Sequence, residues 1–386
     1  MKKTQLAAAL CGAIAAVAAG AAHAQSNVTL YGVLDGGLSY VSNVGGSKNF
    51  GTADGLQSGN RWGLKGSEDL GSGLSAVFTL ENGFNITNGN MGQGTREFGR
   101  QAFVGLSSKS LGTVTIGRQY DSVVDFVSGM TAAKLFATKL GAHVGDVDNL
   151  YNSFRINNSI KYTSANYAGF SFGGLYGFSN QPSNAATPGS GFANNRAWSL
   201  GASYANGPVK FGIGYMEVGS PNGSNTGGAV SGDYSGDFYT TKVGTTSYGV
   251  DKQRVFATAG SYSFGPATVA LVYSNTQLKY VSNTGARVSN YEINGTYNLT
   301  PSVMLGLSYT YTDASTRSAT LANLSPKYHQ VNAAVDYAFS RRTDVYLVGI
   351  YQKAAGDASA ASINGAGGAS STKTQAAVIS GLRHKF

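Results

Sequence analysis

The chain has 386 residues, of which 42% are hydrophobic and only 12% are charged, and it contains 54 Gly, 23 Tyr, 18 Phe and 7 Pro. Its formal net charge is +9, but the basic residues are dispersed and form no basic run or nucleic-acid motif, so we expect no nucleic-acid partner. This composition is typical of many short strands with one apolar and one polar face.

The first residues predict an exported protein. Two lysines precede an apolar run, and residues 22–24 (Ala-His-Ala) match an A-x-A cleavage site. We therefore expect residues 1–24 to be a secretory signal peptide and residues 25–386 to form one barrel domain. Cleavage would remove Cys11, the single cysteine, and would lower the formal charge from +9 to +7 by removing the two lysines. Disulfides and thiol chemistry are then excluded from the mature chain.

The remaining chain contains no apolar stretch near the roughly 20 residues that a membrane-spanning helix needs. Apolar and polar residues alternate instead, which predicts strands whose outer face meets lipid and whose inner face meets water. These candidate strands lie near residues 28–40, 60–68, 73–82, 98–107, 111–119, 155–164, 169–178, 196–205, 208–217, 253–264, 266–278, 287–299, 302–313, 327–339, 343–353 and 375–386. The fold class is therefore all-β, a transmembrane antiparallel β-barrel of about sixteen strands.

The connections between these strands alternate in length. Short links rich in Gly and Pro separate every second pair, and long links such as residues 218–252 and 354–374 separate the others. Short turns at one rim and long loops at the other are the outer-membrane arrangement. A soluble β-sandwich or propeller is the alternative, but it would have to bury one face of every strand against protein.

One long connection, between the strands near 111–119 and 155–164, is more apolar than the others. Its centre, residues 131–141, predicts a short helix that Gly141 could end. Long ordered loops are usually functional, so we expect this third loop to fold inward and narrow the barrel. A cap outside the barrel or a contact with a neighbouring subunit is the alternative.

The chain finishes on Phe386, at the end of an alternating segment. We expect this last strand to close the barrel by pairing with the first strand, which begins near Val28. Phe386 shares the parity of Val378 and Leu382, which places its ring on the outer face, where aromatic residues suit the membrane interface.

The segments VTLYGVLDGGLSY, NRWGLKGSEDLGSGLSAVFTLENGF, RQAFVGLSSKSLGTVTIGRQYD and GLRHKF resemble the general porins of Gram-negative outer membranes, particularly the betaproteobacterial branch. The resemblance implies a homotrimer in the outer-membrane lipid. Each barrel would hold a water-filled channel for passive diffusion of small hydrophilic solutes and ions, narrowed by the third loop. It also implies that the outer-membrane assembly machinery reads Phe386 as an assembly signal.

The same resemblance places a basic wall at the constriction, with candidates Arg61, Lys65, Arg100, Arg118 and Arg155. Alternation supports Arg61, which shares a face with Lys65, and Arg155. Only the resemblance supports Arg100 and Arg118, and Arg118 points inward only if its strand bulges near Gly117. For each arginine the alternative is a surface or interface ion pair.

Acidic residues of the third loop would face this wall, and the candidates are Asp121, Asp125, Asp146 and Asp148. Lys134, Lys139 and His143 of the same loop oppose them. The loop lacks the PEFGG stretch of enterobacterial relatives, so no particular acid is placed in the constriction. A basic wall beside a mixed loop predicts a weak preference for anions.

The sequence gives little support for catalysis, a metal or a cofactor. No H-E-x-x-H or G-x-S-x-G motif occurs, and His143, His329 and His384 are scattered. We therefore expect a channel and not an enzyme. Two alternatives stay open: a solute-selective porin, and a surface-interaction barrel of the adhesin type whose loops bind a partner. The loops concerned lie near residues 41–59, 179–195, 218–252 and 354–374.

Overall fold

The computed structural model describes residues 27–182, 191–222, 225–234, 238–243, 246–317 and 323–386. The expected signal peptide, residues 1–24, lies outside the described residues. Within the described ranges no helix is long and apolar enough to cross a membrane.

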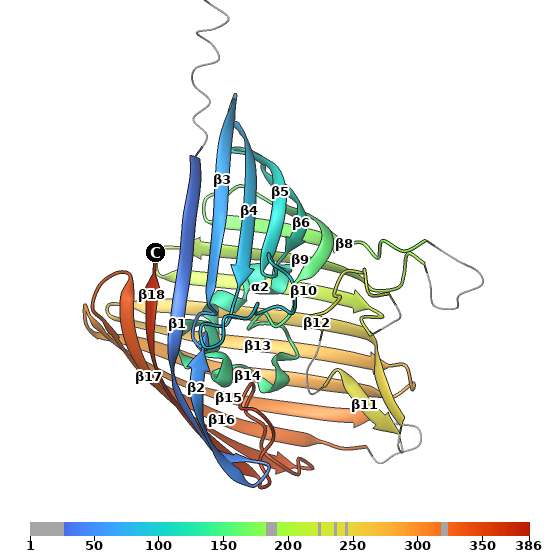
Figure 1. Ribbon diagram of the computed structural model, residues 1–386, viewed down its shortest axis with the longest axis vertical. Coiled ribbons are helices and arrows are strands. Elements are labelled where there is room, and N and C mark those ends of the chain that lie inside the picture. Colours follow the sequence, from blue (N-terminus) through green and yellow to red (C-terminus); the bar gives the residue numbers. More distant parts are fainter. Residues whose placement is uncertain (1–26, 183–190, 223–224, 235–237, 244–245, 318–322) are drawn as a thin grey trace, which may run out of the picture.

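Antiparallel strands, each paired with its neighbours in the chain, form a closed barrel (Figure 1). Their bounds are β1 Asn27–Val44, β2 Ser47–Asp54, β3 Arg61–Gly71, β4 Leu74–Gly83, β5 Gln101–Ser108, β6 Gly112–Gln119, β7 Ile156–Thr163, β8 Phe170–Gly177, β9 Arg196–Asn206, β10 Val209–Gly219, β11 Thr240–Val243, β12 Thr246–Phe264, β13 Ala267–Tyr280, β14 Gly285–Thr300, β15 Val303–Arg317, β16 Pro326–Ala338, β17 Thr343–Gly356 and β18 Thr374–Lys385.

The wall of the barrel has sixteen strand positions, as the sequence predicts. β2 and β3 follow one another along the same edge of β1 and together fill one position. In the described part of the chain, β11 pairs with Thr246–Gly249, the first residues of β12. This short hairpin belongs to the long connection that follows β10. The number of wall strands predicted from the alternating hydrophobic pattern is therefore correct, although the sheet contains two further strand segments.

The prediction of a solvated loop at residues 41–59 is wrong for most of that range. β1 continues to Val44, and the chain returns at once as β2. Gly45 and Gly46 make the turn, with φ values of 58° and 103° that glycine adopts without steric cost. A two-residue glycine turn joins two strands directly, so only residues 55–60 remain outside the strands here.

The barrel closes between β1 and β18, where Val33–Val41 pair with residues 377–385. At the end of this seam the amide of Phe386 donates to the carbonyl of Gly32 (3.1 Å), and the amide of Gly32 donates to the carbonyl of Phe386 (3.0 Å). Figure 1 shows the C-terminus beside β1. The predicted pairing of the last strand with the first is confirmed.

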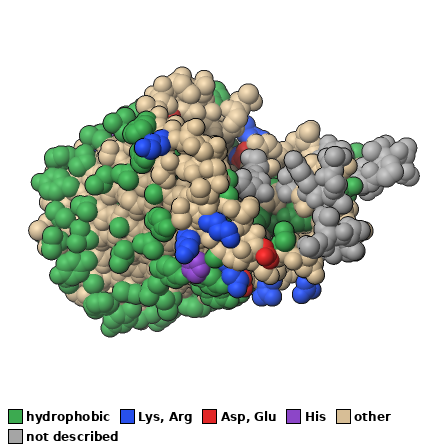
Figure 2. Space-filling model, turned by 90° about the horizontal axis from the view of Figure 1, so that it is seen from below, with side chains coloured by type: hydrophobic (Ala, Val, Ile, Leu, Met, Phe, Trp, Pro, Cys, Tyr) green, Lys and Arg blue, Asp and Glu red, His purple; other side chains and the backbone are tan. Residues whose placement is uncertain are grey.

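The two faces of the strands differ as the alternation predicts. On β15 the large side chains Leu305, Leu307 and Tyr309 are exposed on the outside, whereas Ser308 and Thr310 face inward. Hydrophobic side chains cover a broad part of the surface in Figure 2, away from the end that carries the long loops. An apolar outer surface over a polar inner wall is the arrangement that a bilayer requires of a barrel.

The third loop connects β6 to β7 and folds into the barrel. It contains α2 (Ser122–Phe126) and the short turns η1 (Ser128–Met130), η2 (Ala133–Ala137), η3 (Lys139–Gly141) and η4 (Val144–Asp146). The helix predicted over residues 131–141 is interrupted at Thr138, which has φ 63°. The chain there forms one π-helical turn followed by one 3-10 turn.

Glycines of the inner wall make room for this loop. A Cβ at Gly306 would collide with the ring of Phe136, and one at Gly214 would lie 2.9 Å from the Cα of Val123. Polar side chains of the wall also hold the loop by hydrogen bonds to its backbone: the amide of the Asn294 side chain donates to the carbonyl of Met130 at 2.9 Å. The loop is therefore packed against the inner face, and the alternative of an outside cap is wrong.

Candidate functional site

Basic side chains gather where the third loop faces the wall formed by β3 and β4. Glu81 on β4 lies at their centre: its carboxylate is 2.7 Å from Nε of Arg100 and 3.7 Å from Nε of Arg61. Tyr31 of β1 donates a hydrogen bond of 2.9 Å to the same carboxylate. One acid therefore holds two arginines side by side, and both keep part of their side-chain surface exposed.

Arg155 joins this group from the end of the third loop, just before β7. Its guanidinium lies over the ring of Tyr120, 5.8 Å from the centroid, and the hydroxyl of Tyr120 is 3.2 Å from Arg100. Among the residues that the structure describes, Arg155 has no ion pair, and its Nε has no hydrogen-bond partner. Its positive charge is thus the least compensated of the group.

Lys134, on η2 of the third loop, lies near these arginines. Its ammonium donates to the carbonyl of Tyr151 (2.6 Å) and lies 4.5 Å from the centroid of the Tyr151 ring. Burial lowers the pKa of Lys134 to about 7, and the positive charges of Arg155, Arg100 and Arg61 act in the same direction. We call Arg61, Arg100, Arg155 and Lys134 the basic cluster.

The structure thus brings together Arg61, Arg100 and Arg155 of the predicted wall. Lys65 lies beside them, with its ammonium 5.4 Å from the ring centroid of Tyr31. Arg118 is placed elsewhere. The strand does bulge, between Gly117 and Gln119, but the Arg118 guanidinium is buried against the carbonyl of Gly99 and forms an ion pair with Asp233.

The predicted acids of the third loop are mostly structural. Asp121 caps α2 by accepting from the amides of Val123 and Val124, and burial raises its pKa to about 6, with Asp125 adding to the shift. Asp146 accepts from the amides of Tyr151 and Ser153. Both carboxylates are fully buried. They satisfy backbone donors inside the loop and therefore do not line water.

The other two predicted acids of the third loop are Asp125 and Asp148. Asp125 forms an ion pair with Lys161 of β7 and is the one predicted acid with a substantially exposed side chain. Asp148 is buried and accepts from Ser274 of β13 at 2.5 Å and from Asn290 of β14 at 3.2 Å. The predicted acidic face of the constriction is therefore reduced to Asp125.

His143 links the third loop to the barrel wall. Its Nδ1 is 2.6 Å from Oδ2 of Asp148 and its Nε2 is 3.2 Å from Oε2 of Glu292 on β14. A neutral imidazole carries only one N–H, so bonding to two carboxylates favours the protonated ring. Burial alone would lower the pKa of His143, but the two carboxylates outweigh it and hold this pKa well above 6.5. We call these three residues the loop clasp.

Sequence reasoning missed several residues of the site. Glu81, Tyr120 and Tyr151 organise the basic cluster, and Glu292 anchors the third loop by accepting from the amide of Ala132 at 2.8 Å. Glu292 occupies an inward position among neutral polar residues of β14, so its parity was a usable signal. Nothing local to the sequence marks the tyrosines, because they are frequent in every strand.

A closed antiparallel barrel with an apolar outer face, a polar inner wall and a loop folded inside it defines a transmembrane channel protein of the β-barrel class. The family model described as Gram-negative porin matches residues 7–317. The chain is 33% identical to an outer membrane porin protein of Bordetella pertussis over 92% of this chain and 94% of that protein.

Two further similarities agree. The outer membrane porin protein 32 of Delftia acidovorans is 28% identical over the full length of both chains. The solved structure of an anion-selective porin from Comamonas acidovorans has a TM-score of 0.72 at 25% identity and covers 94% of this chain and 100% of its own. The chain belongs to the Gram-negative porin family. It is an outer-membrane porin, a channel for passive diffusion of small hydrophilic solutes and ions.

Proposed function

We propose that the basic cluster makes this porin prefer anions. The supporting observation is the imbalance of charge at the site: the basic cluster contains three arginines, of which Arg61 and Arg100 share the carboxylate of Glu81, and three of the four predicted loop acids are buried in other roles. Charged groups at a constriction bias ion passage without a binding site of high affinity. The anion-selective porin from Comamonas acidovorans, which has a similar fold, supports the same preference.

The proposal extends to Lys65 and Asp125 as flanking charges of opposite sign at the channel wall. It also includes the absence of catalysis, since diffusion through a polar lumen requires neither a nucleophile nor a cofactor. We further propose that the mature protein begins after residue 24. We also propose that it assembles as a homotrimer, because the barrel exposes an apolar surface that suits both lipid and a second subunit.

Recording from the purified protein in a planar bilayer tests pore activity and assembly together. We expect open channels whose conductance falls in groups of three equal steps, one step for each barrel. Conductance that rises in separate steps, not grouped in threes, would contradict the trimer but not the channel activity. The lack of any open channel would contradict diffusion as the activity.

Deletion of Phe386 should reduce the amount of assembled barrel far more than it changes conductance. The deletion removes two backbone hydrogen bonds to Gly32, each worth about 1 kcal/mol, which is a small loss for a barrel of this size. A large loss of folded protein would therefore reflect recognition by the assembly machinery. The measurement is the folded fraction in outer membranes, judged by mobility on unheated gels.

A matched control for this deletion is Phe339→Ala. Phe339 is also an exposed aromatic residue at the rim with short turns, following β16. It should leave assembly near the level of the unchanged protein. Equal assembly of the Phe386 deletion and the unchanged protein would remove Phe386 as an assembly signal.

A further inference from the structure

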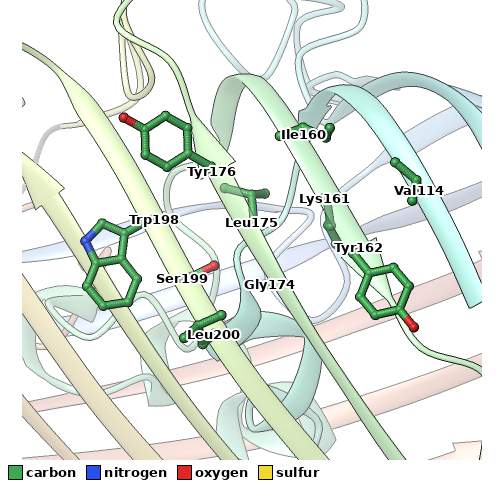
Figure 3. Close-up of a pocket in the computed structure, with 10 residues that line it drawn as sticks. All are labelled: Val114, Ile160, Lys161, Tyr162, Gly174, Leu175, Tyr176, Trp198, Ser199 and Leu200. Carbon is green, nitrogen blue, oxygen red and sulfur yellow. The ribbon is translucent and has the colours of Figure 1, made fainter. Parts of the chain in front are cut away.

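The outer face of the barrel carries an apolar groove across β6, β7, β8 and β9, with a volume of about 510 Å³ (Figure 3). The outward side chains around it are apolar or aromatic: Val114, Ile160, Tyr162, Tyr176, Trp198 and Leu200. Several of them are strongly exposed, including Leu200 at 57%. Because these strands lie in the wall that faces the membrane, the groove opens toward the hydrocarbon region.

The groove exists because an outward position of β8 is glycine. Phe172 and Tyr176 point outward on either side of Gly174, which has no side chain to fill the space between them. A Cβ at Gly174 would lie 2.6 Å from Cδ2 of Leu200 and 3.2 Å from the carbonyl oxygen of Ser199. Even a small side chain there would therefore occupy the groove or displace Leu200.

A second hollow, of about 410 Å³, lies at the loop-bearing end of the same strands. Its lining includes Arg96 of the connection between β4 and β5, Arg118 of β6, and Thr226, Gly227 and Ser231 of the connection between β10 and β11. Both arginines contact Asp233, Arg96 at 2.9 Å, so two positive charges share one carboxylate. The Arg96 guanidinium also donates to the carbonyls of Gln93 and Ser231, and its side chain remains 32% exposed.

The two hollows lie next to one another along β6 and β7. Ile116 pairs with Ile160, and Val114 pairs with Tyr162. Ile116 lines the basic hollow while Ile160 and Val114 line the apolar groove. Two residues along a strand span roughly 7 Å. The basic hollow therefore lies directly beyond the apolar groove, on the side of the external loops.

We propose that these two adjacent hollows together bind one lipid of the outer leaflet, with a phosphate of its headgroup at Arg96 and an acyl chain in the groove over Gly174. The long loops mark the external side of the membrane, so the basic end lies at the level of the outer-leaflet headgroups. A phosphate there forms charge-assisted hydrogen bonds with a guanidinium. A second copy of the chain would cover the apolar groove but would leave the excess positive charge unexplained.

Trp198 provides a reporter for the test, since it borders the groove and the chain has only two tryptophans. In a Trp62→Phe background, the purified oligomer is placed in vesicles containing brominated phosphatidic acid or brominated phosphatidylcholine, and quenching of Trp198 gives the relative affinity of the two lipids. We expect phosphatidic acid to be favoured roughly fivefold, the effect of one basic group near a membrane surface.

Arg96→Gln should reduce this preference to less than twofold without changing channel conductance. Arg287→Gln, which removes an exposed arginine at the loop-bearing end of β14, should leave it unchanged. Gly174→Val should weaken quenching by both lipids, because it fills the groove. Equal affinity for the two lipids in the unchanged protein would overturn the headgroup site. Lack of quenching by either lipid would overturn the proposal in favour of a second copy of the chain over the groove.

Discussion

Replacing Arg155 with glutamate is expected to move the channel from anion preference to cation preference. Arg155 is buried, has no ion pair in the described part of the chain and lies within the field of Arg100 and Arg118. The substitution changes the local charge by two units. A unit charge acts on an ion about 4 Å away with about 1 kcal/mol even in bulk water, which corresponds to a roughly fivefold bias in local concentration.

The measurement is the zero-current potential of the Arg155→Glu channel in a potassium chloride gradient. Its sign should be opposite to that of the unchanged channel, with conductance still present. Arg254→Gln serves as the control, because Arg254 lies on the outer face of β12 in an exposed pair with Glu217, and its loss should leave the potential unchanged. An unaltered potential in Arg155→Glu would show that this residue does not set the selectivity.

Replacing His143 with glutamine should loosen the third loop. His143 bridges Asp148 of the loop and Glu292 of the wall, and all three side chains are buried. Removing one partner of a buried ion pair typically costs roughly 3–5 kcal/mol, because the remaining charge is left uncompensated. We expect frequent brief closures and a broadened distribution of single-channel conductance at voltages where the unchanged channel stays open.

His329→Gln is the matched control for this variant. His329 lies on the exposed face of β16, where it contacts the hydroxyl of Tyr309 at 2.7 Å. Its replacement should leave the conductance distribution unchanged. If His143→Gln channels closed no more often than the unchanged channel, the loop clasp would not hold the third loop in place.

The same clasp predicts a dependence on pH. The folded-state pKa of His143 lies well above 6.5, so its stabilising effect is complete below 6.5 and is lost as the pH rises through the raised value. Burial alone would raise the pKa of Asp148, but His143 outweighs it and lowers this pKa below 3.8. The clasp therefore survives mild acid, and closures should increase on the alkaline side.

The barrel could be predicted from the sequence because each strand exposes one face to lipid, which forces an alternation that is visible in the residues. The position of Arg61 followed from the same parity. Arg155 did not follow from it, because Arg155 precedes β7 and the pairing of β7 with β6 shifts register between Ile156 and Ser159. Arg118 did not, because the bulge after Gly117 and the ion pair with Asp233 depend on loops far away in the chain.

The loop acids mark the limit of such reasoning. Asp121 and Asp146 look like candidates for a pore wall, but backbone amides of the loop compete with water for their oxygens. Which competitor wins depends on the turns of the loop, and these turns follow from contacts with distant glycines such as Gly306 and Gly214. The composition and the residue spacing of the loop do not indicate these contacts.

Selection of anions by the basic cluster can be measured directly as the zero-current potential of the unchanged channel in a potassium chloride gradient. We expect a potential whose sign shows that chloride crosses more readily than potassium. A potential of the opposite sign, with potassium preferred, would contradict it.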